Sequence, residues 1–424
     1  MIKIIKKLQD AQNDILNIMA PIAETEKVTL MEAFERIAAG DATAGFCVPP
    51  FDTSAMDGFA VKSADFSDAA SLKNGLKLDI IGELAAGATL KFHVTSGKAV
   101  KIMTGAPLPE GADAILMKEL CEETKTENEW HLKTVSPIRA GQHVRTVGTD
   151  FKKGDVIIPR GSFLNPAAIG LLASAAIAEI LVYKTPVVAV LSTGDELIDP
   201  LEPAAREKGF VPGPGKIMNS NLYLLASLLR SSGARPHLLG MAKDTPEGIS
   251  RKILEGSGAA DIIITTGGAS VGSYDYIPEA LKLAGFEVNI WKMNMKPGRP
   301  FIFGIKNENQ RMKMVFGLPG NPASSMVSFL KIIRPVIYKL CGRAAPLETL
   351  RVKGAINSEV RLDPERLTFL RARIYEDGGR TMIDVPKKQD SNILSSALRL
   401  NCLAEIPSGK GTLPEGSEVF AQII

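Results

Sequence analysis

Short apolar runs alternate with helix-spaced apolar residues between Thr185 and Leu340, and this alternation predicts an α/β arrangement. The run from Ile262 to Ile264 is unbroken and β-branched, which is typical of a parallel strand buried on both faces. Similar patterns predict strands over residues 187–191, 237–241, 262–264 and 314–317, a helix over 221–229, and helices that begin at Pro246, Pro278 and Pro322. The order of these elements predicts a doubly wound α/β domain over residues 185–340.

The pattern differs on the N-terminal side of this domain. An early helix that Gly40 ends is predicted by four apolar residues on one face, Leu30, Ala33, Phe34 and Ile37. Strand-like stretches separated by Gly and Pro follow, which indicates a β-rich insertion. These stretches are residues 77–84, 98–105, 113–120 and 130–136.

Helical character returns after the insertion and gives way to β structure near the C-terminus. Asn165 and Pro166 are typical of the cap and first position of an apolar helix at residues 167–178. Alternation after Cys341, with a hairpin at residues 377–379, predicts a compact β domain. We therefore expect a discontinuous helical domain (1–48 and 149–184), a β-rich insertion (49–148), the α/β domain (185–340) and a C-terminal β domain (341–424).

The composition is that of a globular protein without a bias toward nucleic acid. The chain has 424 residues, 45% of them hydrophobic, and its 50 basic and 47 acidic residues are interspersed, with a net charge of +3. We therefore expect no nucleic-acid or membrane partner. The four cysteines form no CxxC pair, which favours a reducing cytoplasm over a disulfide framework or a zinc site. The longest apolar stretch, residues 167–178, is too short to span a bilayer.

Polar loops follow four of the predicted strands at the point where each strand ends. They contain Ser192 to Glu196, Asp244 and Thr245, Gly267, Gly268 and Ser270, and Pro319 to Asn321. Because the carboxyl ends of parallel strands meet at one edge of a sheet, we expect a ligand site there. The glycines present bare N–H groups that, with the hydroxyl of Ser270, suit a phosphate or another oxyanion. A glycine-rich turn is also common in doubly wound domains, and Asp195 or Glu196 is alternatively a helix cap.

The stretch from Trp291 to Lys296 alternates like a strand. A period of two predicts that Lys292 and Lys296 share one face, with a Lys296-Pro297-Gly298-Arg299-Pro300 turn at its end. The side chains of both lysines, and of the turn, would then point toward an approaching anion. A pair of strand lysines is also typical of an ordinary solvated face, so this segment alone leaves both interpretations open.

Six motifs in this order resemble the molybdopterin molybdenumtransferase family, which includes the C-terminal domain of gephyrin. They are PPFDTSAMDGFAV, IMTGAPLPEGADAILM, STGDEL, TTGGASVGSYDY, MKPGRPFIFG and LPGNPASS, and they cover the chain nearly end to end. The resemblance implies a homodimer of four-domain chains: a helical domain, a β-rich insertion, a molybdopterin-binding α/β domain and a C-terminal β-barrel. It also implies a reaction in which molybdate enters adenylylated molybdopterin and AMP is released with the help of Mg²⁺.

The family pattern assigns roles to residues of this sequence. Asp57, Thr104 and Asp150 as catalytic residues, and Arg145 as a substrate-binding residue, would come from the partner subunit and complete the cleft. The carboxylates of Asp195, Glu196, Asp244 and Asp275 would hold Mg²⁺, with Asp244 and Asp275 also catalytic. The substrate anions would be bound by Gly267, Gly268, Ser270, Lys292, Lys296, Arg299, Pro319 and Asn321. Arg299 departs from the Lys that many relatives carry, which leaves the fine positioning at that point open.

Two other functions are compatible with parts of the sequence. A nucleotide pyrophosphatase of related fold, of the competence-damage type, would share the glycine loop but would not be expected to carry PPFDTSAMDG or the C-terminal β domain. A scaffold role of the gephyrin type would require a partner peptide, which nothing in the sequence demands. The choice between molybdate and tungstate stays open.

Overall fold

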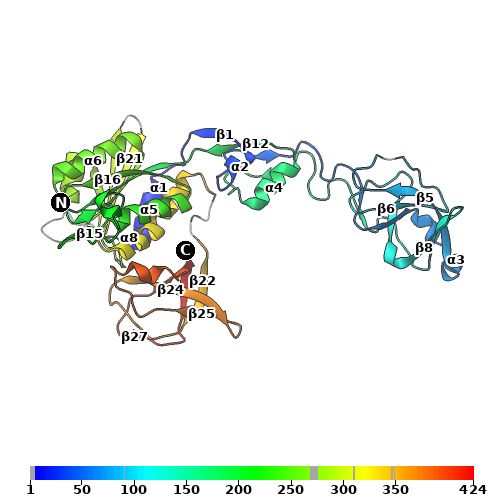
Figure 1. Cartoon of the computed structure of the whole chain (residues 1–424). Helices are drawn as coiled ribbons and strands as arrows, with labels where there is room; N and C mark the ends of the chain where they lie inside the picture. The colour runs from blue at the N-terminus through cyan, green and yellow to red at the C-terminus, as the bar shows by residue number, and fades with distance from the viewer. Residues whose placement is uncertain (1–4, 90, 268–275, 309–310, 345–346, 348) are drawn as a thin grey trace.

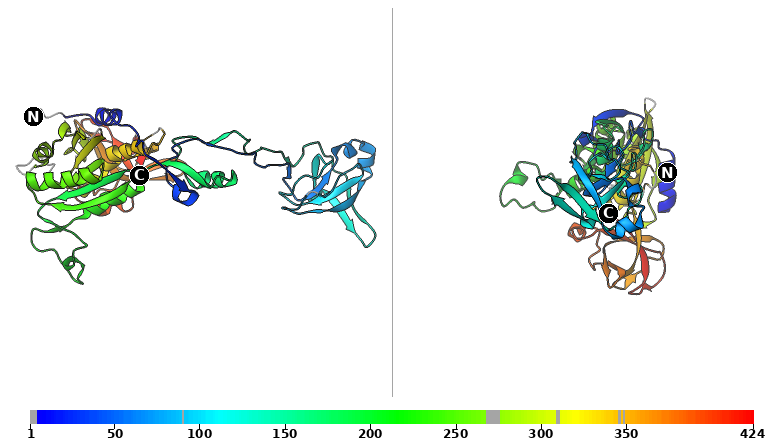
Figure 2. Two further views of the ribbon diagram at one scale, coloured as in Figure 1. Left: turned by 90° about the horizontal axis from the view of Figure 1, so that it is seen from above. Right: turned by 90° about the vertical axis from the view of Figure 1, so that its right-hand side faces the viewer.

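A stalk joins a small β unit to a larger two-part body, so that the chain forms an elongated molecule (Figure 1). The structure is a computed structural model, and it describes residues 5–89, 91–267, 276–308, 311–344, 347 and 349–424. The N- and C-termini both lie on the larger body, and the β unit lies at the far end of the stalk (Figures 1 and 2). No described helix is both long and apolar enough to cross a membrane.

The distal β unit is a six-stranded sheet in the order β7-β4-β6-β5-β9-β8. Its strands are β4 (Gly58–Val61), β5 (Leu76–Leu84), β6 (Lys98–Ile102), β7 (Ala114–Met117), β8 (Cys121–Lys125) and β9 (Trp130–Thr134). Successive side chains of β4 enter different cores, because Phe59 and Val61 pack on one face and Ala60 on the other. The short helix α3 (Ala69–Lys73) is capped by Asp68.

The stalk consists of paired strands and two helices. Its strand pairs are β1 (Thr25–Thr29) with β12 (Glu179–Tyr183), β2 (Ala42–Thr43) with β11 (Val156–Ile158), and β3 (Thr53–Ser54) with β10 (Val144–Arg145). Helix α4 (Pro166–Ser174) begins as expected, since the Asn165 side chain accepts a hydrogen bond from Ala168 N at 2.9 Å. Two chain segments therefore run along the stalk in opposite directions.

The early helix is shorter than the apolar pattern predicts. Helix α2 spans only Leu30–Ala33, and Phe34 and Glu35 leave helical geometry, the latter with φ of 62°. The chain turns away because Glu35 N donates to Leu164 O at 3.0 Å and Leu164 N donates to Arg36 O at 2.9 Å. Tertiary pairing therefore overrides the local periodicity here.

The α/β domain contains a six-stranded sheet in the order β16-β13-β17-β21-β20-β18. Its strands are β13 (Val187–Thr193), β16 (Arg235–Ala242), β17 (Ile262–Thr266), β18 (Glu287–Trp291), β20 (Ile302–Glu308) and β21 (Arg311–Leu318). The first four strands in this order are parallel, and β20 pairs antiparallel with both β21 and β18. The predicted doubly wound α/β fold is confirmed.

Helices cover both faces of this sheet. One face is covered by α1 (Leu8–Asn17), α5 (Ser220–Ser231) and a helical segment made of α8 (Pro322–Ser328), a π-helical turn (Phe329–Ile333) and α9 (Arg334–Leu340). The other face is covered by α6 (Pro246–Ala259) and α7 (Ile277–Leu283). Helix α1 was expected in the helical domain, but Leu8, Ala11 and Ile15 are buried in the core of the α/β domain.

The C-terminal domain is a closed barrel of five strands. They are β22 (Arg351–Ile356), β24 (Leu367–Asp377), β25 (Arg380–Asp384), β26 (Cys402–Ile406) and β28 (Glu418–Ile423). The barrel closes because β24 pairs with β26 as well as with β25. A sixth strand, β19 (Met295–Lys296), comes from the α/β domain and pairs with β24. A short pair, β23 (Val360–Arg361) with β27 (Thr412–Leu413), lies beside the barrel.

Candidate functional site

The main cavity lies where the four parallel strands of the α/β domain end. It has a volume of about 560 Å³ and is lined by the segments that follow β13, β16, β17 and β21. The short parallel pair β14 (Leu197–Ile198) and β15 (Ile217–Met218) borders it, and residues 200–216 between them project from the body (Figure 2). Pro319 and Asn321 line the cavity, and Asn392 of the barrel domain contributes one wall.

The glycine turn after β17 approaches the neighbouring strand too closely for a side chain. Gly267 has φ of 90°, and a Cβ there would lie 2.4 Å from Thr193 O. Beside it, buried hydroxyls are connected, since Thr266 Oγ1 donates to Ser192 Oγ at 3.2 Å. The turn therefore brings a polar backbone directly to the cavity wall.

Three of the predicted metal-binding acids cluster at this edge. Asp244 N donates to Asp195 Oδ1 at 3.4 Å, and Glu196 and Asp244 both line the cavity. Burial, together with the charges of Glu196 and Asp195, raises the pKa of Asp244. A nearby cation would relieve this repulsion, and carboxylate oxygens are the ligand type that a hard divalent ion such as Mg²⁺ prefers.

The described acids alone do not form a complete coordination sphere for a metal ion. Among the residues that the structure describes, no group of three His, Cys, Asp or Glu side chains is close enough to hold a metal ion. Asp275, the fourth predicted ligand, lies outside the described residues, as do Gly268 and Ser270. Their predicted roles, and the metal itself, stay predictions.

Two buried asparagines of the cavity wall were not singled out from the sequence. Asn219 Oδ1 accepts hydrogen bonds from Ser192 Oγ and Leu222 N, and Asn221 Nδ2 donates to Gly320 O at 2.6 Å. The opposite amide atoms, Asn219 Nδ2 and Asn221 Oδ1, are buried and have no partner among the described groups. For Asn219 the available signal was its position as the N-cap of α5, whereas Asn221 lies in the first turn of that helix.

The predicted common face of Lys292 and Lys296 is wrong. β18 ends at Trp291, and Lys292 has φ of 83°, so the alternation of a strand is interrupted there. Lys292 is only 7% exposed and lies against the Trp291 ring, with Nζ 5.9 Å from its centroid. It lines neither the main cavity nor the cavity beside Lys296.

Backbone hydrogen bonds explain the interruption. Lys292 N donates to Phe301 O at 2.7 Å, and Met293 N donates to Arg299 O at 3.0 Å, which folds the Lys-Pro-Gly-Arg-Pro segment into a closed loop. The chain then leaves the α/β sheet and pairs with the barrel. Alternation in the sequence thus spans two separate strands.

Lys296 and Arg299 line a second cavity of about 510 Å³, between this loop and the barrel. The barrel adds two more cations, Arg361 and Arg366, together with the polar side chains of Thr368, Gln389 and Ser391. Pro300, Pro319 and Asn321 border both cavities, so the two are neighbours. The barrel residues are distant in sequence and carry no local motif, which is why sequence reasoning missed them.

A buried carboxylate organises the cations of the second cavity. Asp363 accepts hydrogen bonds from Arg366, with Nη2 2.7 Å from Oδ2, and Lys296 Nζ lies 3.6 Å from the same oxygen. The hydrogen bonds from Arg366 hold the pKa of Asp363 well below its usual range. Asp363 therefore stays ionised and keeps both cations in place.

Two predicted residues of the β-rich insertion, Asp57 and Thr104, form a separate cluster. Asp57 Oδ1 accepts hydrogen bonds from Thr104 N and Thr104 Oγ1, both at 2.8 Å, and Lys118 Nζ lies 3.8 Å from Asp57 Oδ2. The backbone and side-chain hydrogen bonds from Thr104 lower the pKa of Asp57. Arg145 and Asp150 are exposed near the junction with the stalk.

This cluster and the main cavity lie at opposite ends of one chain (Figure 1). A single chain therefore does not bring Asp57, Thr104, Arg145 and Asp150 to the cavity.

Comparison with known proteins agrees with the arrangement of the whole chain. Residues 6–176 match the model "MoeA N-terminal region (domain I and II)", residues 189–339 match "Probable molybdopterin binding domain", and residues 353–424 match "MoeA C-terminal region (domain IV)". The chain is 34% identical over 422 residues to the molybdopterin molybdenumtransferase of Haemophilus influenzae, covering 97% of both chains.

Two further relatives give the same result. The chain is 33% identical over 417 residues to the enzyme of the same name from Nostoc sp., covering 97% of this chain and 92% of the relative. A crystal structure of the molybdopterin biosynthesis moeA protein from Pyrococcus horikoshii OT3 superposes with a TM-score of 0.81 at 30% identity, covering 99% of this chain and 100% of that one. The chain therefore belongs to the molybdopterin molybdenumtransferase family.

Proposed function

We propose that this protein inserts molybdate into adenylylated molybdopterin and releases AMP, as a molybdopterin molybdenumtransferase. The observation that carries the proposal is the pair of neighbouring cavities, one at the edge of the parallel sheet and one lined by four cations. Matches along nearly the entire chain favour this function over a pyrophosphatase that would share only the α/β domain. The relatives' shared name supports the same activity.

The main cavity is the proposed site of the adenylylated pterin. Its Gly267 turn offers backbone N–H groups to the phosphates, and Asn219 and Asn221 add polar amides for the heterocycles. Mg²⁺ held by Asp195, Glu196 and Asp244, with Asp275, would polarise the phosphoanhydride. Without a metal ion these acids would repel the substrate phosphates. We therefore expect substrate and Mg²⁺ to bind together.

The second cavity is the proposed entry site of molybdate. Lys296, Arg299, Arg361 and Arg366 give it a cationic lining that suits a small oxyanion, and Ser391 adds a hydroxyl. Arg299 contributes a planar fork of donors where a lysine would supply a point charge.

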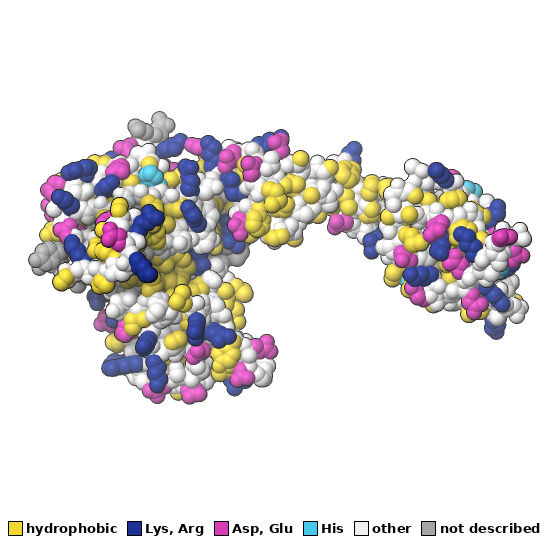
Figure 3. All heavy atoms as spheres, in the orientation of Figure 1, with side chains coloured by type: hydrophobic (Ala, Val, Ile, Leu, Met, Phe, Trp, Pro, Cys, Tyr) yellow, Lys and Arg dark blue, Asp and Glu magenta, His cyan; other side chains and the backbone are white. Residues whose placement is uncertain are grey.

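We further propose that the active enzyme is a homodimer in which the partner's insertion reaches the main cavity. The stalk supports this proposal, because hydrophobic side chains gather on its surface (Figure 3). Met31 is 79% exposed, and Phe163 and Leu181 are 43% and 42% exposed. Apolar surface of this kind is typical of an interface. The cysteines are all free, which fits a cytoplasmic location.

AMP release tests the proposal directly. Purified protein is incubated with adenylylated molybdopterin and either molybdate or tungstate, with Mg²⁺ present, and AMP is measured in a single turnover. We expect AMP release that requires the oxyanion, and the ratio of the two rates would identify the preferred metal. Adenylate that stays intact with both oxyanions would refute the proposed activity.

Two variants separate oxyanion binding from chemistry. Lys296→Ala removes one charge-assisted contact and should weaken molybdate binding about ten- to a hundredfold. Asp244→Asn removes negative charge beside the phosphates, so in the absence of Mg²⁺ the adenylylated substrate should bind as well or better, while AMP release in the presence of Mg²⁺ should slow strongly. Calorimetry alongside single-turnover AMP release measures both effects. Opposite signs from those expected would overturn the assignment of the cations to the oxyanion and the acids to the metal.

A further inference from the structure

One loop of the barrel domain forms part of both cavities. This barrel loop, residues 386–392, follows β25 and has no regular secondary structure. Gln389, Asp390 and Ser391 line the second cavity, and Asn392 lines the main cavity. Irregular loops are the most mobile part of a fold unless specific contacts hold them. The contacts that hold this loop therefore decide the shape of both cavities.

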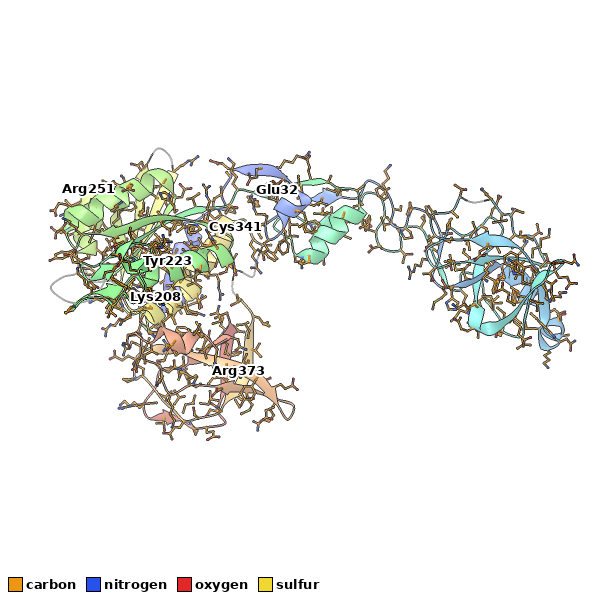
Figure 4. All side chains as sticks on the ribbon, viewed as in Figure 1. Glu32, Lys208, Tyr223, Arg251, Cys341 and Arg373 are labelled. Atoms are coloured by element: carbon orange, nitrogen blue, oxygen red, sulfur yellow. The ribbon has the colours of Figure 1, made fainter. Side chains whose placement is uncertain are left out.

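A buried arginine holds the barrel loop from within the barrel. Arg371, on β24, is 2% exposed, and its Nη2 donates to Asp390 O at 3.1 Å and to Lys388 O at 3.5 Å. Arg371 lies two residues before Arg373 on β24, and Arg373 is labelled in Figure 4. The guanidinium thus binds the main chain of the loop, and its contacts do not depend on the loop's own side chains.

Gln389 completes a reciprocal pair with the same residue. Arg371 N donates to Gln389 Oε1 at 3.1 Å, and Gln389 Nε2 donates to Arg371 O and to Pro386 O, each at 2.9 Å. The loop is therefore tied to β24 at its beginning and in its middle.

The far end of the loop is bound to the α/β domain. Ala323 N, in the first turn of α8, donates to Ser391 O at 3.1 Å, and Asn321 Nδ2 donates to Ser391 Oγ at 2.8 Å. Ser391 thereby satisfies a backbone N–H that α8 leaves open at its start. Asn321 makes no capping bond of its own, although it occupies the N-cap position.

The hydrogen bonds of the Arg371 guanidinium end on the main chain of the barrel loop, at Lys388 O and Asp390 O. Its Nε is buried with no partner among the described groups. Burial lowers the pKa of Arg371, which reflects the cost of holding its charge away from water, and the charge of Asp390 opposes this shift. Removal of the guanidinium would leave these two loop carbonyls without their donor, so its loss acts first on the course of the loop.

We propose that Arg371, together with Gln389, is a positioning residue that sets the geometry of the oxyanion cavity by fixing the barrel loop. Arg371 touches neither cavity and acts through Gln389, Asp390 and Ser391. The proposal rests on the proposed function for the identity of the oxyanion. It assigns to the C-terminal barrel a direct part in the site, carried by one loop.

The test compares two buried arginines in the full-length protein. Arg371→Met removes the two guanidinium contacts to Lys388 O and Asp390 O and leaves the backbone pair with Gln389 in place, and Arg371→Lys keeps the charge with fewer donors. The matched control is Arg334→Met, since Arg334 is also buried, at 7% exposure, donates to Thr349 Oγ1 at 3.1 Å, and lines neither cavity. For each variant we measure the melting temperature, the affinity for molybdate and for adenylylated molybdopterin, and hydrogen exchange of the peptide covering residues 386–392.

Arg371→Met should weaken molybdate binding about tenfold and speed exchange of the loop, because a small displacement of binding groups is costly. Arg371→Lys should restore part of both, and affinity for the adenylylated substrate should change less, since only Asn392 of the loop lines the main cavity. Arg334→Met should lower the melting temperature without changing either readout. Should Arg371→Met fail to fold, Arg371→Lys decides, with a smaller expected change in the same direction.

Two results would overturn the proposal. One is an Arg371 variant with wild-type molybdate affinity and wild-type loop exchange. The other is an equal loss of molybdate affinity in Arg334→Met, which would make the effect a general consequence of destabilisation. If the wild type itself binds no molybdate, the proposed function fails at that point. Loop exchange then still decides whether Arg371 anchors residues 386–392.

Discussion

Asp57 in the insertion and Asp244 at the edge of the parallel sheet are both aspartates expected to act on one substrate. Their surroundings nevertheless shift their pKa values in opposite directions. Thr104 donates two hydrogen bonds to Asp57 and lowers its pKa, whereas burial and two neighbouring acids raise the pKa of Asp244. Asp57 is thus a carboxylate whose charge is already stabilised within its own domain. Asp244 is a carboxylate whose charge is disfavoured by burial and by its acidic neighbours.

The difference teaches that the two regions are incomplete in different ways. The sheet edge has a cavity lined by Glu196 and Asp244, and the positive charge beside these acids is Lys216, whose Nζ donates to Asp195 O at 2.6 Å. The insertion has a hydrogen-bonded carboxylate, Asp57, which lines neither of the two cavities. In the function that we propose, Mg²⁺ completes the first region and a partner subunit completes the second.

The strongest test of this comparison mixes two inactive proteins. Asp57→Ala and Asp244→Ala should each lower kcat/KM about a hundredfold or more, because each removes a catalytic group. Co-refolding equal amounts should restore about a quarter of wild-type activity, since half of the dimers would be mixed and each would keep one intact cleft. Absence of rescue, with mixed dimers demonstrated by mass spectrometry, would contradict a shared cleft.

Metal-dependent stability tests the sheet edge alone. Mg²⁺ at a hundred times its dissociation constant should stabilise the wild type by about 2.7 kcal/mol, and Asp244→Asn should abolish most of that gain. Thermal unfolding with EDTA or Mg²⁺ measures it.

The pH dependence of the same proteins provides a control. Because the folded pKa of Asp244 is raised, the metal-free wild type should lose stability as pH rises from the usual aspartate pKa through the folded one. Asp244→Asn should lack this loss. If Mg²⁺ stabilises the wild type and Asp244→Asn equally, Asp244 does not bind the ion.

Independence of the two regions is tested by a glycine of the insertion. A Cβ at Gly58 would lie 2.0 Å from Leu116 O, so Gly58→Ala should destabilise the insertion by about 1–3 kcal/mol. Affinity for adenylylated molybdopterin at the sheet edge should change little. Calorimetric unfolding should reveal a separate, earlier transition, and a single shifted transition would argue against independence.

The smallest expected effect concerns the Asp57 cluster. Thr104→Val removes the hydroxyl donor and keeps the backbone donor, so the pKa of Asp57 should rise part of the way to its ordinary value. A carboxylate with a lowered folded pKa stabilises the fold above its unfolded pKa, and that contribution is lost as pH falls through the folded value. Because the Asp57 carboxylate would be protonated at a higher pH in the variant, the acid limb of the pH–activity profile should also move to higher pH. An unchanged acid limb would show that the protonation of Asp57 does not control it.

The sequence was most informative where local patterns and tertiary structure agree. The doubly wound α/β fold and the convergence of four strand ends followed from β-branched runs and from loops after each run, and both are confirmed. The cap at Asn165 was predicted from two residues. The roles of the individual site residues stay predictions.

The sequence was least informative where distant segments meet. Lys292 and Lys296 share an alternating stretch, but hydrogen bonds from the backbone of Lys292 and its neighbour to Phe301 O and Arg299 O divide it between two sheets. The second cavity takes Arg361, Arg366 and Ser391 from the barrel, and no local motif connects them to Lys296. Helix α2 ended early because Leu164, far along the chain, pairs with its C-terminal side.

The base of the insertion has a consequence for how such a chain can be altered. Val48 N donates to Phe151 O at 2.9 Å, and Asp150 N donates to Val48 O at 3.0 Å, so the chain enters and leaves the insertion at one closed pair. The strand pairs β1–β12 and β2–β11 of the stalk lie outside these residues. We therefore expect that the insertion can be replaced by another domain whose two ends lie close together, with little disturbance of the rest of the molecule.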